Sequence, residues 1–475
     1  MIDIHDFPDL SSPLRFFEEI SAIPHGSGNC SAIADYLVSF AEERSLTYMR
    51  DAADNVIIKK PATEGYEDRP TVIIQGHTDM VAEKLATLEK DMKTEGIELV
   101  RDGDFLRAVG TTLGGDDGIA VAYALALLDS DDIQHPSLEA LFTSDEEIGL
   151  LGASAVDPAW LDGRIMINVD SDEEGVFTVG CAGGVRVDIA LDVKSAACDT
   201  PAYSLSVSGL LGGHSGIEID KNRSNAIKLT AELLSTVEGA RLVKLEGGNA
   251  DNAIPRDAYA VFTAPSLDKE SFKEAADKTV ALLQASEPSV SVRLEDAEEQ
   301  KSALDLESTR KVLSAINEIK SGVILMSKDI EGLVDTSENL GVARISESGA
   351  AITVSIRSTA DERKEAQLNT LRTVAKEHGA ALSTRGSYPG WAYKQDSVLR
   401  DTCVKVYKET YGKAPEVITI HAGLECGIFA GKLEGLDCIS IGPDNFDIHT
   451  TEEHLSLSSS ERVWGFIKNV LKEIR

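Results

Sequence analysis

The sequence has few cations and no long apolar run, and each shortage excludes a class of protein. Its 475 residues include 46 Lys and Arg against 80 Asp and Glu, so the formal net charge is −34. Because nucleic-acid backbones and anionic membranes attract clustered Lys and Arg, we expect neither as a partner. A transmembrane helix needs roughly 18 consecutive apolar residues, and no run in this chain approaches that length.

Cysteine is also scarce. The six cysteines are scattered and form no CxxC pair. In a chain of this length they indicate reduced thiols, and they argue against a disulfide framework or a zinc ribbon. Residues 1–10 also lack the basic segment and apolar core of a signal peptide. Both features predict a cytoplasmic location.

The pattern of apolar residues changes twice along the chain. Up to residue 190, short strand-like runs alternate with helical patterns, and residues 117–128 read as a nearly all-apolar, buried helix. Residues 203–296 show the order β-α-β-β-α-β, which is typical of a ferredoxin-like unit, and a looser version follows up to residue 385. The first pattern then returns after Trp391.

This alternation predicts an α/β fold in which a mostly parallel sheet carries helices on both faces. We expect residues 1–190 and 391–475 to form this α/β domain together. Residues 191–390 would form a second, α+β domain with ferredoxin-like units, inserted between the two segments.

Histidines and carboxylates gather where predicted strands end. The clusters are QGHTD at 75–79, TTLGGDDG at 111–118, TSDEEIG at 143–149, NVDSD at 168–172 and DIH at 447–449. Each alone has an ordinary explanation, such as a helix cap or a solvated loop. Because ligands of open α/β sheets bind at the carboxyl ends of the strands, the clusters jointly predict a functional site. Two histidines and several carboxylates without a thiol suit zinc, cobalt or manganese, and one shared carboxylate could bridge two ions.

These segments, in this order, resemble the M20 metallopeptidase family, and within it the aminoacyl-histidine (Xaa-His) dipeptidase branch, also called peptidase D. The matching segments span almost the whole chain: GHTDMV at 76–81, TTLGGDDGIA at 111–120, FTSDEEIGLLGA at 142–153, INVDSDEEG at 167–175, GLLGGHSGIEI at 209–219, NAIP at 252–255, HAGLECGIF at 421–429 and IGPDNFDIHT at 441–450. The fold of that family, a metal-binding catalytic domain interrupted by a lid domain, agrees with the organisation predicted above.

The resemblance implies two divalent metal ions per subunit, zinc first, with manganese or cobalt as alternatives. One ion would be bound by His77 and Asp170, and the other by Glu147 and His449. Asp116 would bridge the two ions.

The same resemblance implies roles around the metal ions. Asp79 would orient the ring of His77, and Glu146 would be the general base for a water that bridges the ions. His214, in the inserted domain, would donate to the oxyanion. In related enzymes this histidine often comes from the partner subunit, so we expect a homodimer through the inserted domain.

Four residues would contact a small peptide substrate. Arg357 could clamp the substrate carboxylate, because guanidinium binds carboxylates bidentately, and Asn252 could assist. Glu425 could accept the substrate ammonium, and His421 could contribute as well.

We therefore expect a metal-dependent dipeptidase that hydrolyses unblocked dipeptides of the Xaa-His type, such as β-Ala-His. An enzyme of the same family that acts on other amides, such as N-acyl amino acids or cysteinylglycine, would have the same metal site. This alternative substrate class stays open. A non-catalytic scaffold would have lost Glu146 or a ligand, but all these positions are intact. Asp117 stands where the best-known members of the branch carry Asn. Because of this difference, the identity of the metal and the substrate preference stay open.

Overall fold

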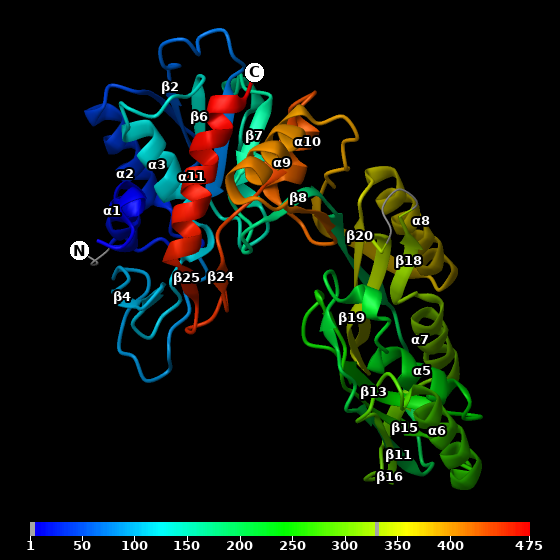
Figure 1. The fold of residues 1–475 in the computed structure, drawn as a ribbon. Helices are drawn as coiled ribbons and strands as arrows, with labels where there is room; N and C mark the ends of the chain where they lie inside the picture. The colour runs from blue at the N-terminus through cyan, green and yellow to red at the C-terminus, as the bar shows by residue number, and fades with distance from the viewer. Residues whose placement is uncertain (1–4, 328–331) are drawn as a thin grey trace. The chain divides into compact units, whose positions relative to one another are not determined.

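The computed structural model describes residues 5–327 and 332–475, and the chain divides into two compact units (Figure 1). Unit 1 comprises Met1–Cys181, Trp391–Thr419 and Leu424–Arg475. Unit 2 comprises Ala182–Gly390 and Ile420–Gly423.

Unit 1 is built on a mixed sheet with the strand order β1-β2-β6-β3-β7-β23-β8-β22. The strands are β1 (Thr47–Arg50), β2 (Val56–Lys60), β3 (Val72–His77), β6 (Leu138–Thr143), β7 (Ile165–Asn168), β8 (Val176–Cys181), β22 (Glu416–Ile420) and β23 (Asp437–Ser440). The central strands β6, β3, β7 and β23 run parallel, whereas β1, β2 and β8 are antiparallel to their neighbours. The carboxyl ends of the central strands therefore meet at one edge.

Helices cover both faces of this sheet. The main core lies under α1 (Ser11–Ser21), α2 (Ser31–Glu43), α3 (Gly115–Asp129), α9 (Val398–Tyr411) and α11 (Leu457–Glu473). Alternate strand residues face it, for example Val72 and Ile74 in β3. As its all-apolar sequence predicts, α3 is buried along its length, and its Tyr123 stacks on Trp464 of α11. Shorter helices α4 (Leu151–Ala155) and α10 (Glu425–Lys432) pack together, and α10 contacts β23 and β8 from outside this core.

A smaller sheet in unit 1 holds the C-terminal segment in place. Its order is β24-β25-β5-β4, from β24 (Asn445–Phe446), β25 (His454–Ser456), β5 (Phe105–Ala108) and β4 (Leu99–Asp102). Residues 447–453 form the connection between β24 and β25. Short 3-10 helices are η1 (Pro8–Leu10) and η2 (Pro158–Trp160) in unit 1, and η3 (Ile219–Lys221) in unit 2.

Unit 2 contains two ferredoxin-like arrangements, one inserted into the other. The first follows the predicted order: β11 (Ala202–Ser208), α5 (Ala226–Ser235), β13 (Arg241–Gly247), β15 (Ala258–Thr263), α6 (Lys269–Leu283) and β16 (Ser291–Asp296). The second consists of β9 (Gly183–Leu191), α7 (Leu306–Glu318), β19 (Val334–Ser346), β20 (Gly349–Ser358), α8 (Asp361–Glu377) and β21 (Ala380–Tyr388). Pairing of β13 with β19 joins them into one sheet, ordered β16-β11-β15-β13-β19-β20-β9-β21, and β18 (Gly322–Met326) pairs with β19.

Strand β9 corrects the position of the first domain boundary. The boundary predicted at residue 190 is wrong, because β9 pairs with β20 and β21 and belongs to unit 2. It also supplies the first strand of the second ferredoxin-like arrangement. Residues 420–423, which the sequence analysis assigned to the α/β domain, likewise belong to unit 2.

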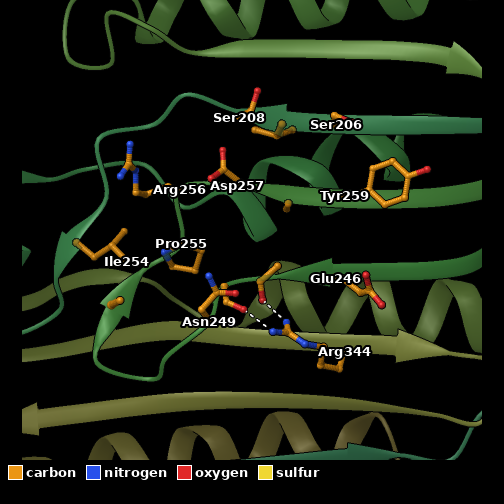
Figure 2. A pocket seen from close by; sticks show the side chains of 15 residues that line it. Ser206, Ser208, Glu246, Asn249, Ile254, Pro255, Arg256, Asp257, Tyr259 and Arg344 are labelled. Atoms are coloured by element: carbon orange, nitrogen blue, oxygen red, sulfur yellow. Dashed lines mark hydrogen bonds between the residues drawn. The ribbon is translucent and has the colours of Figure 1, made fainter. Parts of the chain in front are cut away.

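The helices α5 to α8 cover one face of the unit 2 sheet (Figure 1). The other face carries a groove of about 810 Å³ whose lining includes Ser206, Ser208 and Tyr259 (Figure 2). Arg344, also in the groove, donates to the backbone carbonyls of Gly247 (2.7 Å) and Gly248 (2.6 Å). Two short pairs complete the unit: β10 (Ser195–Ala197) with β17 (Ser302–Leu304), and β12 (Gly213–His214) with β14 (Ala253–Ile254). Across the described ranges, no helix has both the length and the apolar character that crossing a bilayer requires.

Candidate active site

The parallel strands of unit 1 bring the predicted clusters to one edge of the sheet. His77 is the last residue of β3, and the Glu146–Glu147 pair follows the end of β6. Asp170 follows β7, and Asp116 lies in the first turn of α3. The connection between β24 and β25 carries His449 to the same place, within hydrogen-bond distance of Asp116.

The carboxylate of Asp116 lies between two histidines. Its Oδ1 is 3.0 Å from Nε2 of His77, and its Oδ2 is 3.1 Å from Nε2 of His449. Each histidine also has a second carboxylate: Oδ1 of Asp170 is 3.9 Å from Nε2 of His77, and Oε1 of Glu147 is 2.9 Å from Nε2 of His449. The grouping is thus a shared aspartate with one histidine and one further acid on either side.

Within the described residues, three groups could each hold a metal ion, because their ligand atoms lie within 4.8 Å of one another. The groups are His77, Asp116 and Asp170; Asp116, Glu147 and His449; and His77, Glu146 and Glu147. Nitrogen and oxygen donors without a thiol are the set that zinc, manganese and cobalt accept. The residues present therefore fit two divalent ions that share one carboxylate.

The electrostatics of the cluster indicate that it needs positive charge. Burial, followed by the charge of Asp117, raises the pKa of Asp170 well above its ordinary value. Burial also raises the pKa of Asp116, but hydrogen bonds from His449 and His77 outweigh it and hold that pKa below its ordinary value. Hydrogen bonds to Asp116 and Glu147 raise the pKa of His449 to about 10. Without metal ions, the protonated histidines supply the positive charge that the carboxylates need. Bound cations would supply it in their place.

Asp79 is a buried carboxylate that organises its neighbours. Its Oδ1 accepts the backbone N–H of Glu146 (2.9 Å), and its Oδ2 accepts the N–H of Glu147 (3.3 Å) and the hydroxyl of Ser27 (2.8 Å). Nδ1 of His77 lies 3.4 Å from the Asp79 carboxylate and 2.9 Å from its backbone carbonyl. Asp79 therefore holds the Glu146–Glu147 loop as well as the ring of His77, the only role expected for it from the sequence.

Glu146 lies inside the cluster beside Glu147. Burial raises the pKa of Glu146 to about 8, and the charges of Glu425 and Glu147 act in the same direction. A nearby cation would lower this pKa and favour the carboxylate form. The geometry thus offers a carboxylate whose proton affinity is high enough to accept a proton near neutral pH.

Glu425, the first residue of α10, is fully buried in unit 1. Its Oε2 accepts hydrogen bonds from Nε2 of Gln75 (2.5 Å) and Oγ1 of Thr143 (2.6 Å). In the described structure its Oε1 has no hydrogen-bond partner. Burial raises the pKa of Glu425 to about 7. An unpaired carboxylate oxygen of this kind suits a ligand that brings a positive charge or a hydrogen-bond donor.

The remaining predicted residues lie in unit 2. Nδ1 of His214 accepts backbone N–H groups of Gly216 (3.2 Å) and Ile217 (3.1 Å), so its proton resides on Nε2, which is then a hydrogen-bond donor. Burial, followed by the charge of Arg357, lowers the pKa of His214 and keeps the ring neutral. The same two causes lower the pKa of His421 to about 3.

A small cavity in unit 2 is lined by Asn252, Arg357 and Tyr388. Nη1 of Arg357 donates to the hydroxyl of Tyr388 (3.1 Å), and in the described structure its Nε has no partner. His421 is fixed separately, by a hydrogen bond of 2.7 Å between its Nε2 and Oγ of Ser337. Arg357 thus keeps donor capacity for an anionic group.

Two carboxylates outside the predicted set of site residues also shape the cluster. Oδ2 of Asp117 accepts the backbone N–H of His77 (3.1 Å), so this buried side chain fixes the strand end that carries the histidine. Glu453 binds the backbone of residues 113–116. The only sequence signal for Glu453 is an acidic residue four positions after His449.

A parallel-sheet edge that gathers two histidines and several acids around one shared aspartate defines a hydrolase-type site for two divalent cations. The chain belongs to peptidase family M20/M25/M40, whose sequence pattern matches residues 73–473. It is 34% identical over 467 residues to the cytosol non-specific dipeptidase of Escherichia coli (strain K12), with 96% of each chain covered.

Solved structures agree with this assignment. The aminoacylhistidine dipeptidase from Vibrio alginolyticus matches with a TM-score of 0.91 at 34% identity, over 98% of this chain and 97% of that chain. The aminopeptidase PepT from Bacillus cereus shares the fold at 16% identity, with a TM-score of 0.57 over 98% of each chain. The M20 resemblance and the α/β fold predicted from the sequence are confirmed.

Proposed function

We propose that the protein is a metal-dependent dipeptidase that hydrolyses unblocked dipeptides, including Xaa-His substrates such as β-Ala-His. The observation that carries this proposal is the carboxylate of Asp116, which lies 3.0 Å from His77 and 3.1 Å from His449. A carboxylate shared between two histidines is the arrangement that a two-metal hydrolase requires. The choice of dipeptides is supported by relatives at 34% identity that are named as dipeptidases.

In this proposal the chain holds two divalent ions, zinc in the first place, with manganese or cobalt as alternatives. His77 and Asp170 hold one ion, and Glu147 and His449 hold the other. Asp116 is the ligand common to both. When bound, the ions supply Lewis-acid activation of a water molecule and of the scissile carbonyl group.

The protein's own groups carry the proton. Glu146 accepts a proton from the attacking water and passes it to the leaving amine. Asp79 keeps Glu146 in position through the hydrogen bond of 2.9 Å to its backbone N–H. His214, whose Nε2 carries a proton, is the proposed donor to the oxyanion.

The two charged ends of a dipeptide require opposite partners. Arg357, assisted by Asn252 and His421, is proposed to bind the carboxylate, because among the described residues nothing accepts the N–H at its Nε. Glu425 is proposed to accept the ammonium, because one oxygen of its buried carboxylate has no partner in the described structure. A substrate without a free ammonium would leave that buried oxygen unpaired, which disfavours N-acyl amino acids.

We also propose that the protein acts in the cytoplasm as a homodimer that pairs through unit 2. The net charge of −34 disfavours nucleic acid and anionic lipid as partners. The sheet face of unit 2 that the helices leave uncovered offers a surface for a second copy. Sedimentation of the wild type at micromolar concentration tests the dimer, and a monomer would contradict it.

The test of function is a substrate panel with controlled metal content. The protein is stripped with a chelator, reloaded separately with zinc, manganese or cobalt, and assayed on β-Ala-His, Gly-His, Leu-Gly and an N-acetyl amino acid. Metal-restored cleavage of the unblocked dipeptides alone supports the proposal. Cleavage of the acetylated substrate alone would move the function to a deacylase, and cleavage of nothing with any metal would overturn enzymatic function.

A further inference from the structure

We propose that Glu453 is a positioning residue that holds Asp116 ready for the metal ions. Oε2 of Glu453 accepts the backbone N–H groups of Leu113 (2.7 Å) and Gly114 (3.1 Å). Its Oε1 accepts those of Gly115 (2.8 Å) and Asp116 (3.4 Å). One buried carboxylate thus binds four consecutive N–H groups, and the last of them belongs to the proposed bridging ligand. The inference rests on the metal site of the proposed function.

The local sequence explains why a distant carboxylate is needed here. The first N–H groups of a helix have no partner within the helix, and a side chain at the N-cap usually accepts one of them. The N-cap of α3 is Gly114, which has no side chain and adopts a left-handed φ of +70°. A Cβ at this glycine would also approach Sδ of Met80 to 2.8 Å. The turn therefore requires glycine, which offers no capping side chain. Glu453 accepts the N–H groups of the first two helix residues, Gly115 and Asp116, as well as those of Leu113 and Gly114 before the helix.

Glu453 also connects two of the proposed ligands. It lies four residues after His449 in the same short connection, and its own N–H donates to the carbonyl of Thr450 (3.2 Å). When Glu453 binds residues 113–116, it brings the His449 segment and the Asp116 turn together. We infer that this attachment, together with the pairing of β24 with β25, sets the distance of 3.1 Å between His449 and Asp116.

The charge of Glu453 distinguishes it from Glu139, another buried carboxylate that accepts backbone N–H groups. Glu139, near the amino end of β6, accepts the N–H groups of Asp162 (3.0 Å) and Gly163 (3.0 Å) and also pairs with Lys59 (2.7 Å). In the part of the chain that the structure describes, no Lys or Arg forms an ion pair with Glu453. The N–H dipoles stabilise its negative charge, but burial outweighs them and raises the pKa of Glu453. Bound cations beside Asp116 would stabilise the charge further.

The experiment compares Glu453→Gln with Glu139→Gln, a matched substitution in the same unit that lies away from the cluster. Both variants keep side-chain volume and remove a buried carboxylate that holds backbone N–H groups. Metal affinity is measured by zinc competition with a chromophoric chelator, and the ligand field is followed by the visible spectrum of the cobalt form. We expect Glu453→Gln to bind zinc about 10- to 100-fold more weakly, with an altered cobalt spectrum. Glu139→Gln should match the wild type in both. Wild-type zinc affinity in Glu453→Gln would overturn the proposal.

A second measurement applies if Glu453→Gln does not fold. Hydrogen exchange of the wild-type protein is followed at the backbone amides of residues 113–116, with and without metal. We expect these amides to be protected in the metal-free protein, because Glu453 holds them before the ions bind. Rapid exchange that slows only after metal is added would overturn the proposal. Neither measurement uses a substrate, so failure of the dipeptidase assay and failure of this inference are distinguishable.

Discussion

Replacing Glu146 with Gln separates proton transfer from metal binding, because two adjacent glutamates have different proposed roles. Oε1 of Glu147 lies 2.9 Å from His449, in the group proposed to hold an ion. Glu146 is proposed to accept the proton of the attacking water. Asp79 holds both residues through their backbone N–H groups, at 2.9 Å and 3.3 Å, and a Gln at either position retains that bond. Either variant therefore keeps the loop in place and changes only one carboxylate.

The expected magnitude follows from the chemistry of each position. Loss of a general base lowers turnover by about 10²- to 10⁴-fold, or about 3 to 5 kcal/mol in activation free energy. Because burial raises the pKa of Glu146 to about 8, the metal-free wild type already buries a neutral side chain here at pH 7. At pH 7 the wild type must take up a proton here on folding, whereas Gln need not, so Glu146→Gln should raise the free energy of unfolding of the metal-free protein by about 3 kcal/mol at that pH. Glu147→Gln should instead weaken metal binding.

The assay measures kcat and bound metal on the same samples. Reloaded Glu146→Gln should contain as much zinc as the wild type while its turnover falls, and Glu147→Gln should lose zinc. The structure also contains a competing group, in which His77, Glu146 and Glu147 lie together. If Glu146→Gln loses zinc to the same extent as Glu147→Gln, Glu146 is a ligand and the general-base assignment is wrong. Full turnover in Glu146→Gln would refute it as well.

Three further predictions test other parts of the molecule. Arg357→Lys should raise KM for free dipeptides about tenfold or more, because Lys cannot form a bidentate pair with a carboxylate; an equal loss on C-terminally amidated dipeptides would refute the carboxylate contact. Glu338→Gln should raise the free energy of unfolding at pH 8 by about 3 kcal/mol, because burial raises the pKa of Glu338 from 4.5 to about 7 and the folded state disfavours its charge. The gain should vanish below pH 4.5, where Glu338 is protonated in both the folded and the unfolded wild type. Urea titrations in which the free energies of unfolding of variant and wild type differ by the same amount at every pH would contradict it. Chelation should lower the thermal midpoint of the wild type far more than that of Asp116→Asn, since ions that bind only the folded state stabilise it; equal shifts would place the ions elsewhere.

The sequence by itself determined the features that depend on neighbouring residues. The β-α-β-β-α-β order of residues 203–296 could be predicted because each strand and helix has its own period and its own turns. The histidine and acid clusters could be predicted because each follows a recognisable strand or opens a helix, and parallel strands end at one edge. Residue types and their order also indicated the metal class and the M20 family.

Only the tertiary structure decided the features that depend on distant pairing. Strand β9 belongs to unit 2 because Ala190 pairs with Ala351 and with Ala381, and no local pattern records such partners. Glu453 acts on Leu113, 340 positions earlier in the chain, and no local pattern in the sequence records that contact. The distances from Asp116 to His77 and His449 likewise follow from how separate segments pack. Periodicity and motifs report what each segment prefers, whereas packing decides which segments meet.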